Sequence, residues 1–217
     1  MEKNRSGQFI ALLALIVAIV GVSVGFAAFS SALSIQSSAT VTPDKSTMNV
    51  DFSSSDTAVV TNDIKPTTTP STVEATDATI DNSSDPVIKN LSATFKEPGQ
   101  KAVYTFYAYN AGELEAFLKS IVYENVSSKS SNKVCTAGEG TTDALVQKAC
   151  DGIFLKVKVG TEAETSSGIA SINNHSLAKG VSEEITVTLE YASNAERVDG
   201  DFTVSFGDVT LNYSSVD

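Results

Sequence analysis

The sequence predicts an all-β protein, in which an antiparallel, jelly-roll-like β-sandwich follows one N-terminal hydrophobic helix. Short segments with alternating apolar residues recur from Leu33 to Tyr213, and Gly, Pro, Asn and Asp separate them. About nine such segments, with almost no helix between them, are typical of a sandwich. One uncharged apolar run, residues 9–29, precedes most of them and predicts the helix.

The apolar run from Phe9 to Phe29 has the length of a membrane-spanning helix, for which about 20 apolar residues suffice. Lys3 and Arg5 precede the run, and basic residues tend to stay on the cytoplasmic side. The remainder of the chain is therefore directed outward. We expect an exported protein that is extracellular or held at the cell surface.

The same run also fits a secretory signal, which is cut after small residues placed one and three positions before the cleavage point. Gly25 and Ala27 meet this requirement for a cut between Ala27 and Ala28, and a second match precedes Leu33. Retention of the helix as a membrane anchor is the alternative. Residues 1–27 are thus a signal peptide or a transmembrane helix.

Residues 28–46 form an N-terminal strand segment in this interpretation, and residues 47–217 form the sandwich. In the first segment, apolar side chains share the odd positions and so one face of a strand: Leu33, Ile35, Ala39 and Val41. The Ser/Thr/Pro-rich stretch at about 53–86 predicts a long loop or edge excursion, with a strand possible over 73–80.

The rest of the chain predicts a regular succession of strands and turns. Pro98 and Gly99 suit a type II turn, and apolar residues on both faces of the strand that follows indicate a central position in a sheet. Residues 114–123 fit either a strand or a short helix, and residues 143–150 predict one helix. The further predicted strands are 48–52, 87–95, 153–159, 185–191, 202–206 and 209–213.

The chain has two cysteines, Cys135 and Cys150. In an oxidising compartment they predict a disulfide that closes a short loop, and in the chain-entropy model such a loop contributes roughly 3 kcal/mol. Two free thiols or half of a metal site are the alternatives. With no other cysteine and a single histidine in the chain, the disulfide is the preferred interpretation.

The formal net charge of −11 argues against nucleic acid as a partner, because binding it requires Lys and Arg against the phosphates. No cofactor is predicted. Asp199 and Asp201 are the candidates for a weak calcium site, although a turn that uses Asp and Gly for its backbone geometry explains them equally.

No catalytic residues are predicted. His175 is the only histidine, so a zinc site with several imidazoles or a metallopeptidase His-Glu-x-x-His motif is absent from the sequence. A Ser-His-Asp site would need this same histidine, and no pair among the many carboxylates is singled out for glycoside hydrolysis. The aromatic strand with Tyr104, Phe106, Tyr107 and Tyr109 fits core packing better than a carbohydrate platform.

Two stretches carry a family resemblance. The leader ends in GFAAFSS and leads directly into an alternating strand, and the later stretch NLSATFKEPGQKAVYTFYAYNAGELEAFL combines a Pro-Gly turn, an aromatic strand and an Asn-x-Gly turn. This arrangement resembles the TasA/camelysin family of exported bacterial proteins. The resemblance implies a leader removed by a dedicated signal peptidase and a jelly-roll sandwich. Camelysin-type proteins have also been classed as metallopeptidases, which the sequence does not favour.

The resemblance further implies assembly into extracellular matrix fibres, as in biofilms, with the freed N-terminal strand completing the sheet of a neighbouring subunit. Carried onto this chain, the donor is the segment from Ala28 to Val41. We therefore expect a homopolymer that forms head to tail and depends on the export machinery. The alternative is a membrane-anchored adhesin or a pilin-like subunit that keeps its helix. Gly7 then resembles a prepilin cleavage site, but Leu12 stands where most type IV pilins have Glu.

Overall fold

The computed structural model describes residues 14–18, 48–56, 62–83, 85–127, 129–166 and 175–215. The chain divides into two units, Met1–Thr42 and Pro43–Asp217. In the first unit, residues 14–18 are helical. Within the described ranges, no helix combines the length and apolar character needed to cross a membrane. The predicted cleavage and donor residues (Ala27, Ala28, Leu33, Ile35, Ala39 and Val41) lie outside the described residues.

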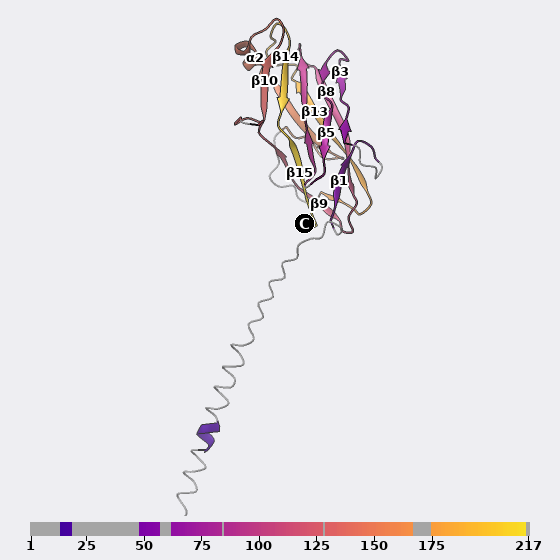
Figure 1. Ribbon diagram of the computed structural model, residues 1–217, viewed down its shortest axis with the longest axis vertical. Coiled ribbons are helices and arrows are strands. Elements are labelled where there is room, and N and C mark those ends of the chain that lie inside the picture. Colours follow the sequence, from indigo (N-terminus) through magenta and orange to yellow (C-terminus); the bar gives the residue numbers. More distant parts are fainter. Residues whose placement is uncertain are drawn as a thin grey trace, which may run out of the picture. The chain divides into compact units, whose positions relative to one another are not determined.

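The second unit is an antiparallel sandwich, as predicted (Figure 1). Its first layer is one sheet in the order β1 (Val50–Ser53), β8 (Lys101–Asn110), β13 (Ser182–Tyr191) and β11 (Ile153–Val159). The short strand β3 (Thr67–Thr69) pairs with β8 on the same side as β1 and further along it. The long strands β8 and β13 thus form the middle of this layer.

The second layer consists of two sheets, and each of the four strands of the first is next in the chain to a strand of the second. One has the order β10 (Lys133–Ala137), β14 (Phe202–Phe206), β7 (Ser92–Phe95) and β4 (Glu74–Ala75). The other has the order β12 (Ser176–Leu177), β9 (Ala116–Tyr123), β15 (Val209–Ser214), β6 (Val87–Lys89), β5 (Ala78–Asp81) and β2 (Asp63–Ile64). Four pairs of strands are consecutive in the chain and have one member in each sheet: β9 and β10, β14 and β15, β6 and β7, and β4 and β5. The two sheets are therefore halves of one layer that is interrupted at a single level.

The core lies between the two layers. Residues of alternating position along β8, β13, β14 and β15 are buried, which is the pattern that one inward face of each strand produces. The rings of Phe95 and Tyr191 come from opposite layers and their centroids are 6.1 Å apart, while Tyr191 and Phe202 meet edge to face at 5.4 Å. Such tilted aromatic contacts bury large apolar areas and hold the layers in register.

Two segments with ambiguous sequence patterns are strands. Residues 114–123 contain β9 rather than a helix, because its apolar side chains lie between the layers and its backbone pairs with β15. The Ser/Thr/Pro-rich excursion contributes β2, β3, β4 and β5, of which β2, β3 and β4 lie at sheet edges. The predicted turn after β7 has Gly99 at φ 92°, a conformation that favours glycine.

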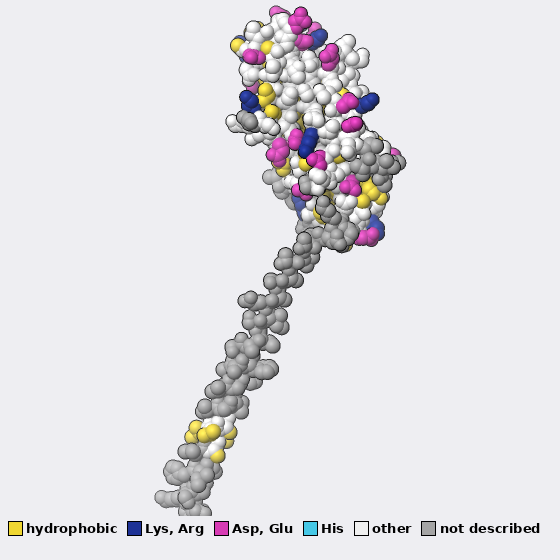
Figure 2. Space-filling model, viewed as in Figure 1, with side chains coloured by type: hydrophobic (Ala, Val, Ile, Leu, Met, Phe, Trp, Pro, Cys, Tyr) yellow, Lys and Arg dark blue, Asp and Glu magenta, His cyan; other side chains and the backbone are white. Residues whose placement is uncertain are grey.

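The charged residues of the sandwich lie mainly on its surface. On the face that Figure 2 shows, acidic side chains are spread over the domain, with basic side chains between them. Ion pairs such as Lys89–Asp81 and Lys156–Glu190 join partly exposed strands. The excess of acidic residues is thus distributed over the exterior.

Candidate assembly surface

The sheet edges are the parts of a sandwich to which a strand from another molecule can add, because their outward peptide groups lack a strand partner. In this sandwich, the described edges of β10, β1 and β11 are each covered by side chains or by a returning loop. The seam between β9 and β11 is different, since it holds an apolar pocket.

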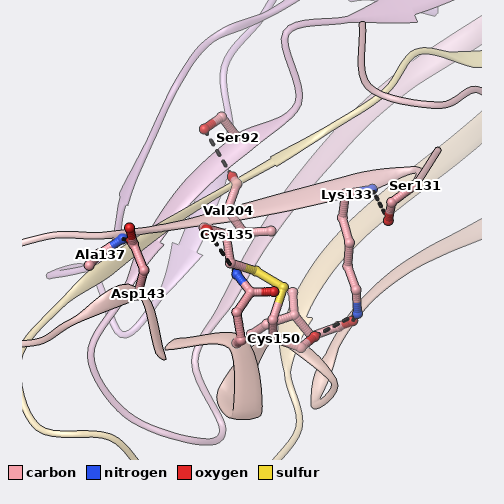
Figure 3. The surroundings of a disulfide bond; sticks show 10 residues. Ser92, Ser131, Lys133, Cys135, Ala137, Asp143, Cys150 and Val204 are labelled. Carbon is pink, nitrogen blue, oxygen red and sulfur yellow. Dashed lines mark hydrogen bonds between the residues drawn. A yellow bond between two sulfur atoms is a disulfide. The ribbon is translucent and has the colours of Figure 1, made fainter. Parts of the chain in front are cut away.

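The edge of β10 is covered by helix α2 (Asp143–Cys150), which the disulfide holds in place (Figure 3). The predicted bond between Cys135 and Cys150 is present. The backbone N–H of Ala137 donates to the Asp143 carboxylate at 3.0 Å, and the Gln147 amide donates to the carbonyl of Cys135 at 3.4 Å. Side chains of α2 therefore take the place of a neighbouring strand.

Lys133 connects the C-terminal end of this helix to β11. Its Nζ donates to the carbonyls of Cys150 and Ile153, both at 2.6 Å, as Figure 3 shows for Cys150. Burial lowers the pKa of Lys133, and nearby Asp151 offsets part of this effect. Lys133 thus donates a hydrogen bond to the carbonyl of Ile153, which is the first residue of β11.

The edge of β1 is covered by one asparagine side chain. The Asn82 carboxamide accepts from the N–H of Phe52 at 2.9 Å and donates to the carbonyl of Phe52 at 3.0 Å. A carboxamide has the same donor and acceptor arrangement as a peptide group. Asn82 therefore imitates a strand at this position.

The edge of β11 is covered by the loop that follows it. Val157 and Thr165 exchange two backbone hydrogen bonds, at 2.8 and 2.9 Å. The hydroxyl of Tyr123 reaches across from β9 and donates to the carbonyl of Thr165 at 3.0 Å. Burial raises the pKa of Tyr123, so the phenol keeps its proton and remains a donor.

The seam between β9 and β11 contains a pocket of about 160 Å³. Its walls are mostly apolar and come from both layers: Leu118, Ile121, Val157, Val159, Glu162, Ala163 and Thr165. Strand β12 pairs with β9 only at Ala116 and Phe117, and His175 adds one backbone bond to Leu118. Beyond Leu118, no strand within the described ranges pairs with this side of β9.

His175 lies at the end of this seam and is held between two carboxylates. It is 9% exposed; its Nδ1 is 3.2 Å from Glu162 Oε1 and its Nε2 is 2.8 Å from Glu183 Oε2. Burial of the ring lowers its pKa, but the hydrogen bonds and charges of Glu183 and Glu162 outweigh it, so the pKa of His175 is raised above 6.5. The ring joins the loop after β11, the start of β12, and β13.

We call the contacts of His175 with Glu162 and Glu183 the histidine clamp, and we expect it to make the free energy of unfolding depend on pH. A raised pKa means that the clamp stabilises the folded chain fully below pH 6.5 and loses that contribution as the pH rises through the folded-state pKa. Relative to His175→Gln, the wild-type free energy of unfolding should be larger at acidic pH by on the order of 1 kcal/mol, with the difference shrinking above neutrality. Urea titrations of both proteins at several pH values measure this. A difference that does not change with pH contradicts it.

Of the two calcium candidates, Asp199 is exposed and Asp201 has structural partners. Asp201 Oδ1 accepts from the N–H of Glu139 at 2.6 Å, and two further backbone bonds join Asp201 to Gly138 and Glu139. Gly200, with φ 84°, allows the close approach of these loops. In the part of the chain that the structure describes, no group of three His, Cys, Asp or Glu side chains is arranged to hold a metal ion.

The aromatic strand divides between the two faces of β8. Tyr104 and Phe106 are fully buried in the core, whereas Tyr107 and Tyr109 lie half-buried on the outer face. The hydroxyl of Tyr107 is 3.4 Å from the Glu184 carboxylate. The four rings therefore do not share a face and do not form one carbohydrate platform.

No family model, no curated protein and no solved structure matches this chain.

Proposed function

We propose that this protein is the structural subunit of an extracellular or cell-surface fibre and polymerises by donating its N-terminal strand to a neighbouring copy. The observation that carries the proposal is the apolar pocket at the β9–β11 seam, beside the part of β9 with which no strand in the described ranges pairs.

The donor segment has the chemistry that the seam requires. Residues 28–41 carry no charge, and Leu33, Ile35, Ala39 and Val41 alternate so that they share one face of an extended strand. Added to β9 beyond Leu118, such a strand would bond to the outward peptide groups and place its apolar face against Ile121 and Val157. Backbone hydrogen bonds would supply affinity and the pocket would supply register.

This contact joins two different surfaces and does not close on itself, so repeated addition makes a filament. The proposal includes a jelly-roll arrangement of the sandwich and release of the donor by a signal peptidase after export. It needs no enzymatic activity and no cofactor. The boundary between the two units, after Thr42, separates the proposed donor from the sandwich.

Deletion of residues 28–41 should abolish fibres and leave exported monomers, because the sandwich keeps its own strands and loses only its link. Electron microscopy and sedimentation of the secreted protein measure this. Ile35→Asp should have the same effect, since it places a charge on the apolar face. Ser34→Asp is the matched control, with the same charge on the opposite face, and should still assemble. Fibres that persist after the deletion would exclude strand donation.

The alternative is a subunit that retains its helix, as a membrane-anchored adhesin or in a pilin-like filament. The helical residues 14–18 within the uncharged apolar run favour it. The mass of the mature N-terminus separates the cases. A start near Ala28 supports strand donation, a start at Gln8 supports a pilin, and an uncut N-terminus supports an anchor.

A further inference from the structure

The second layer contains a polar groove where its two sheets meet. Four times the chain passes from a strand of one sheet to a strand of the other, and the four breaks lie at the same level. They separate β4 from β5, β6 from β7, β14 from β15, and β9 from β10. The interruption leaves a hollow of about 550 Å³. We call it the crease; it is lined by Thr76, Asn90, Leu91, Ser92, Glu124, Asn125, Val126, Ser127, Ser205, Phe206, Gly207 and Asp208.

The crease is supported by contacts that fix its shape. The hydroxyl of Tyr104 crosses the core from β8 and lies 3.0 Å from the carbonyl of Thr76 and 3.1 Å from that of Ser92. These are carbonyls at the points where the strands break, so a buried side chain of the opposite layer satisfies them. Burial raises the pKa of Tyr104 to about 12, which keeps the phenol protonated and able to donate.

Gly207 maintains the close approach of the strands at the same level. A Cβ atom at this position would lie 2.1 Å from the carbonyl oxygen of Glu124, a distance that no side chain can accept. The N–H of Gly207 donates to the carbonyl of Asn132 at 2.9 Å, and the N–H of Phe206 donates to that of Leu91 at 2.8 Å. The backbone around the crease is therefore paired, and the hollow is a fixed feature of the surface.

The lining combines hydroxyl, carboxamide and carboxylate groups, and it contains no Lys, Arg or His. Of its three apolar residues, Leu91 and Phe206 are buried in the core and Val126 is half-buried. Asn125 and Ser127 are exposed, and neither side chain bonds to any other residue that the structure describes. Glu124 and Asp208 are backbone partners, with the N–H of Glu124 2.8 Å from the carbonyl of Asp208. The two carboxylates add acceptors to the lining and so favour a ligand that donates hydrogen bonds.

We propose that the crease binds a neutral saccharide through its hydroxyl groups. The volume lies within the range of small-ligand sites, about 300–1,000 Å³. Sugar hydroxyls both donate and accept, which matches the mixed lining, and the half-buried Val126 offers apolar contact to the C–H face of a ring. Anionic saccharides would meet the two carboxylates, and Lys89, which interacts electrostatically with Asp208, is already paired with Asp81 at 2.7 Å.

A peptide strand fits this groove less well than a saccharide does. Strand addition needs outward peptide groups along a sheet edge. The crease instead runs across the strands on the face of the layer, where the neighbouring peptide groups are already paired. The proposal is independent of strand donation, because none of the lining residues belongs to the β9–β11 seam.

The test is equilibrium binding of the full chain to cellobiose, maltose and chitobiose, with digalacturonate as the anionic probe, by calorimetry or by chemical-shift titration. We expect at least one neutral disaccharide to bind in the millimolar range or tighter, and digalacturonate to bind at least tenfold more weakly. Asn125→Ala and Ser127→Ala should each weaken that binding about three- to tenfold. Asn194→Ala, an exposed asparagine outside the crease, is the matched control and should bind as the wild type does.

Three results would overturn the proposal. The first is that no neutral disaccharide binds at about 50 mM, which is 50-fold above 1 mM. The others are that digalacturonate binds equally well, or that Asn125→Ala and Ser127→Ala leave the binding unchanged. Binding of an unstructured peptide that competes with the disaccharide at lower concentration would assign the crease to a protein ligand instead. Fibre formation plays no part in the readout, so a failed assembly experiment and a failed binding experiment remain distinguishable.

Discussion

Replacing both Cys135 and Cys150 by serine should lower the free energy of unfolding by about 3 kcal/mol, the chain-entropy value for a loop of this length. The disulfide closes a loop with a sequence separation of 15. Urea denaturation of the double variant beside the wild type measures the change. A difference below about 1 kcal/mol would mean that contacts of α2 alone hold the loop in place.

The same substitution should also promote association of the sandwiches. Without the disulfide, helix α2 can leave the edge of β10, and the peptide groups of Cys135 and Ala137 lose the Gln147 and Asp143 partners that cover them. In a chain that lacks residues 28–41, we expect concentration-dependent oligomers in light scattering. The control is Asp143→Ala with the disulfide intact, which removes one edge hydrogen bond but leaves the helix attached, and it should remain monomeric in the absence of residues 28–41.

The elements that could be predicted from the sequence are those with local signals. The alternation in residues 101–110 marks β8, the Pro98–Gly99 pair marks the turn before it, and Asp143 begins the helix between the cysteines. Each signal involves residues close together in the chain, where spacing and backbone preference decide the conformation. The disulfide was predictable because the chain offers its two cysteines no other partner.

The contacts that define the edges could not be predicted, because they join residues far apart in the sequence. Asn82 pairs with the backbone of Phe52, and in the sequence it is only one of several asparagines that have a serine two residues later. His175 reads as a loop histidine, but its environment is set by Glu162 and Glu183 on two other elements. The crease depends on four strand breaks falling at one level, which no local pattern encodes.

Asn110 shows how one side chain can hold several elements near the seam. It is fully buried at the end of β8, where its Nδ2 donates to the carbonyls of Leu114 and Leu177, both at 2.8 Å. Its Oδ1 accepts from the N–H of Gly112 at 3.0 Å. The sequence predicted a turn here, and the structure adds that the turn residue also ties β12 to the start of β9.

Asn110→Ala should therefore destabilise the sandwich by about 3 kcal/mol, because three buried hydrogen bonds are lost and a small cavity is left. Asn110→Asp should cost a similar amount at neutral pH, since a carboxylate keeps the acceptor for Gly112 but opposes two carbonyl oxygens. Protonation of that carboxylate restores one donor, so the Asp variant should recover part of its stability as the pH falls. The exposed Asn125→Ala, measured in the same urea titrations, should stay within about 0.5 kcal/mol of the wild type.

The Asn110 variants also test the seam. Loss of the bond to Leu177 should loosen β12 from β9, so hydrogen exchange at Ala116 and Leu118 should accelerate more than exchange in the centre of β13. If the seam accepts a donated strand, the loosened edge should change the extent of fibre assembly. This change should be seen at urea concentrations at which the sandwich is still folded. Uniform acceleration of exchange across both layers would show instead that Asn110 acts only on global stability and that β12 has no separate role at the seam.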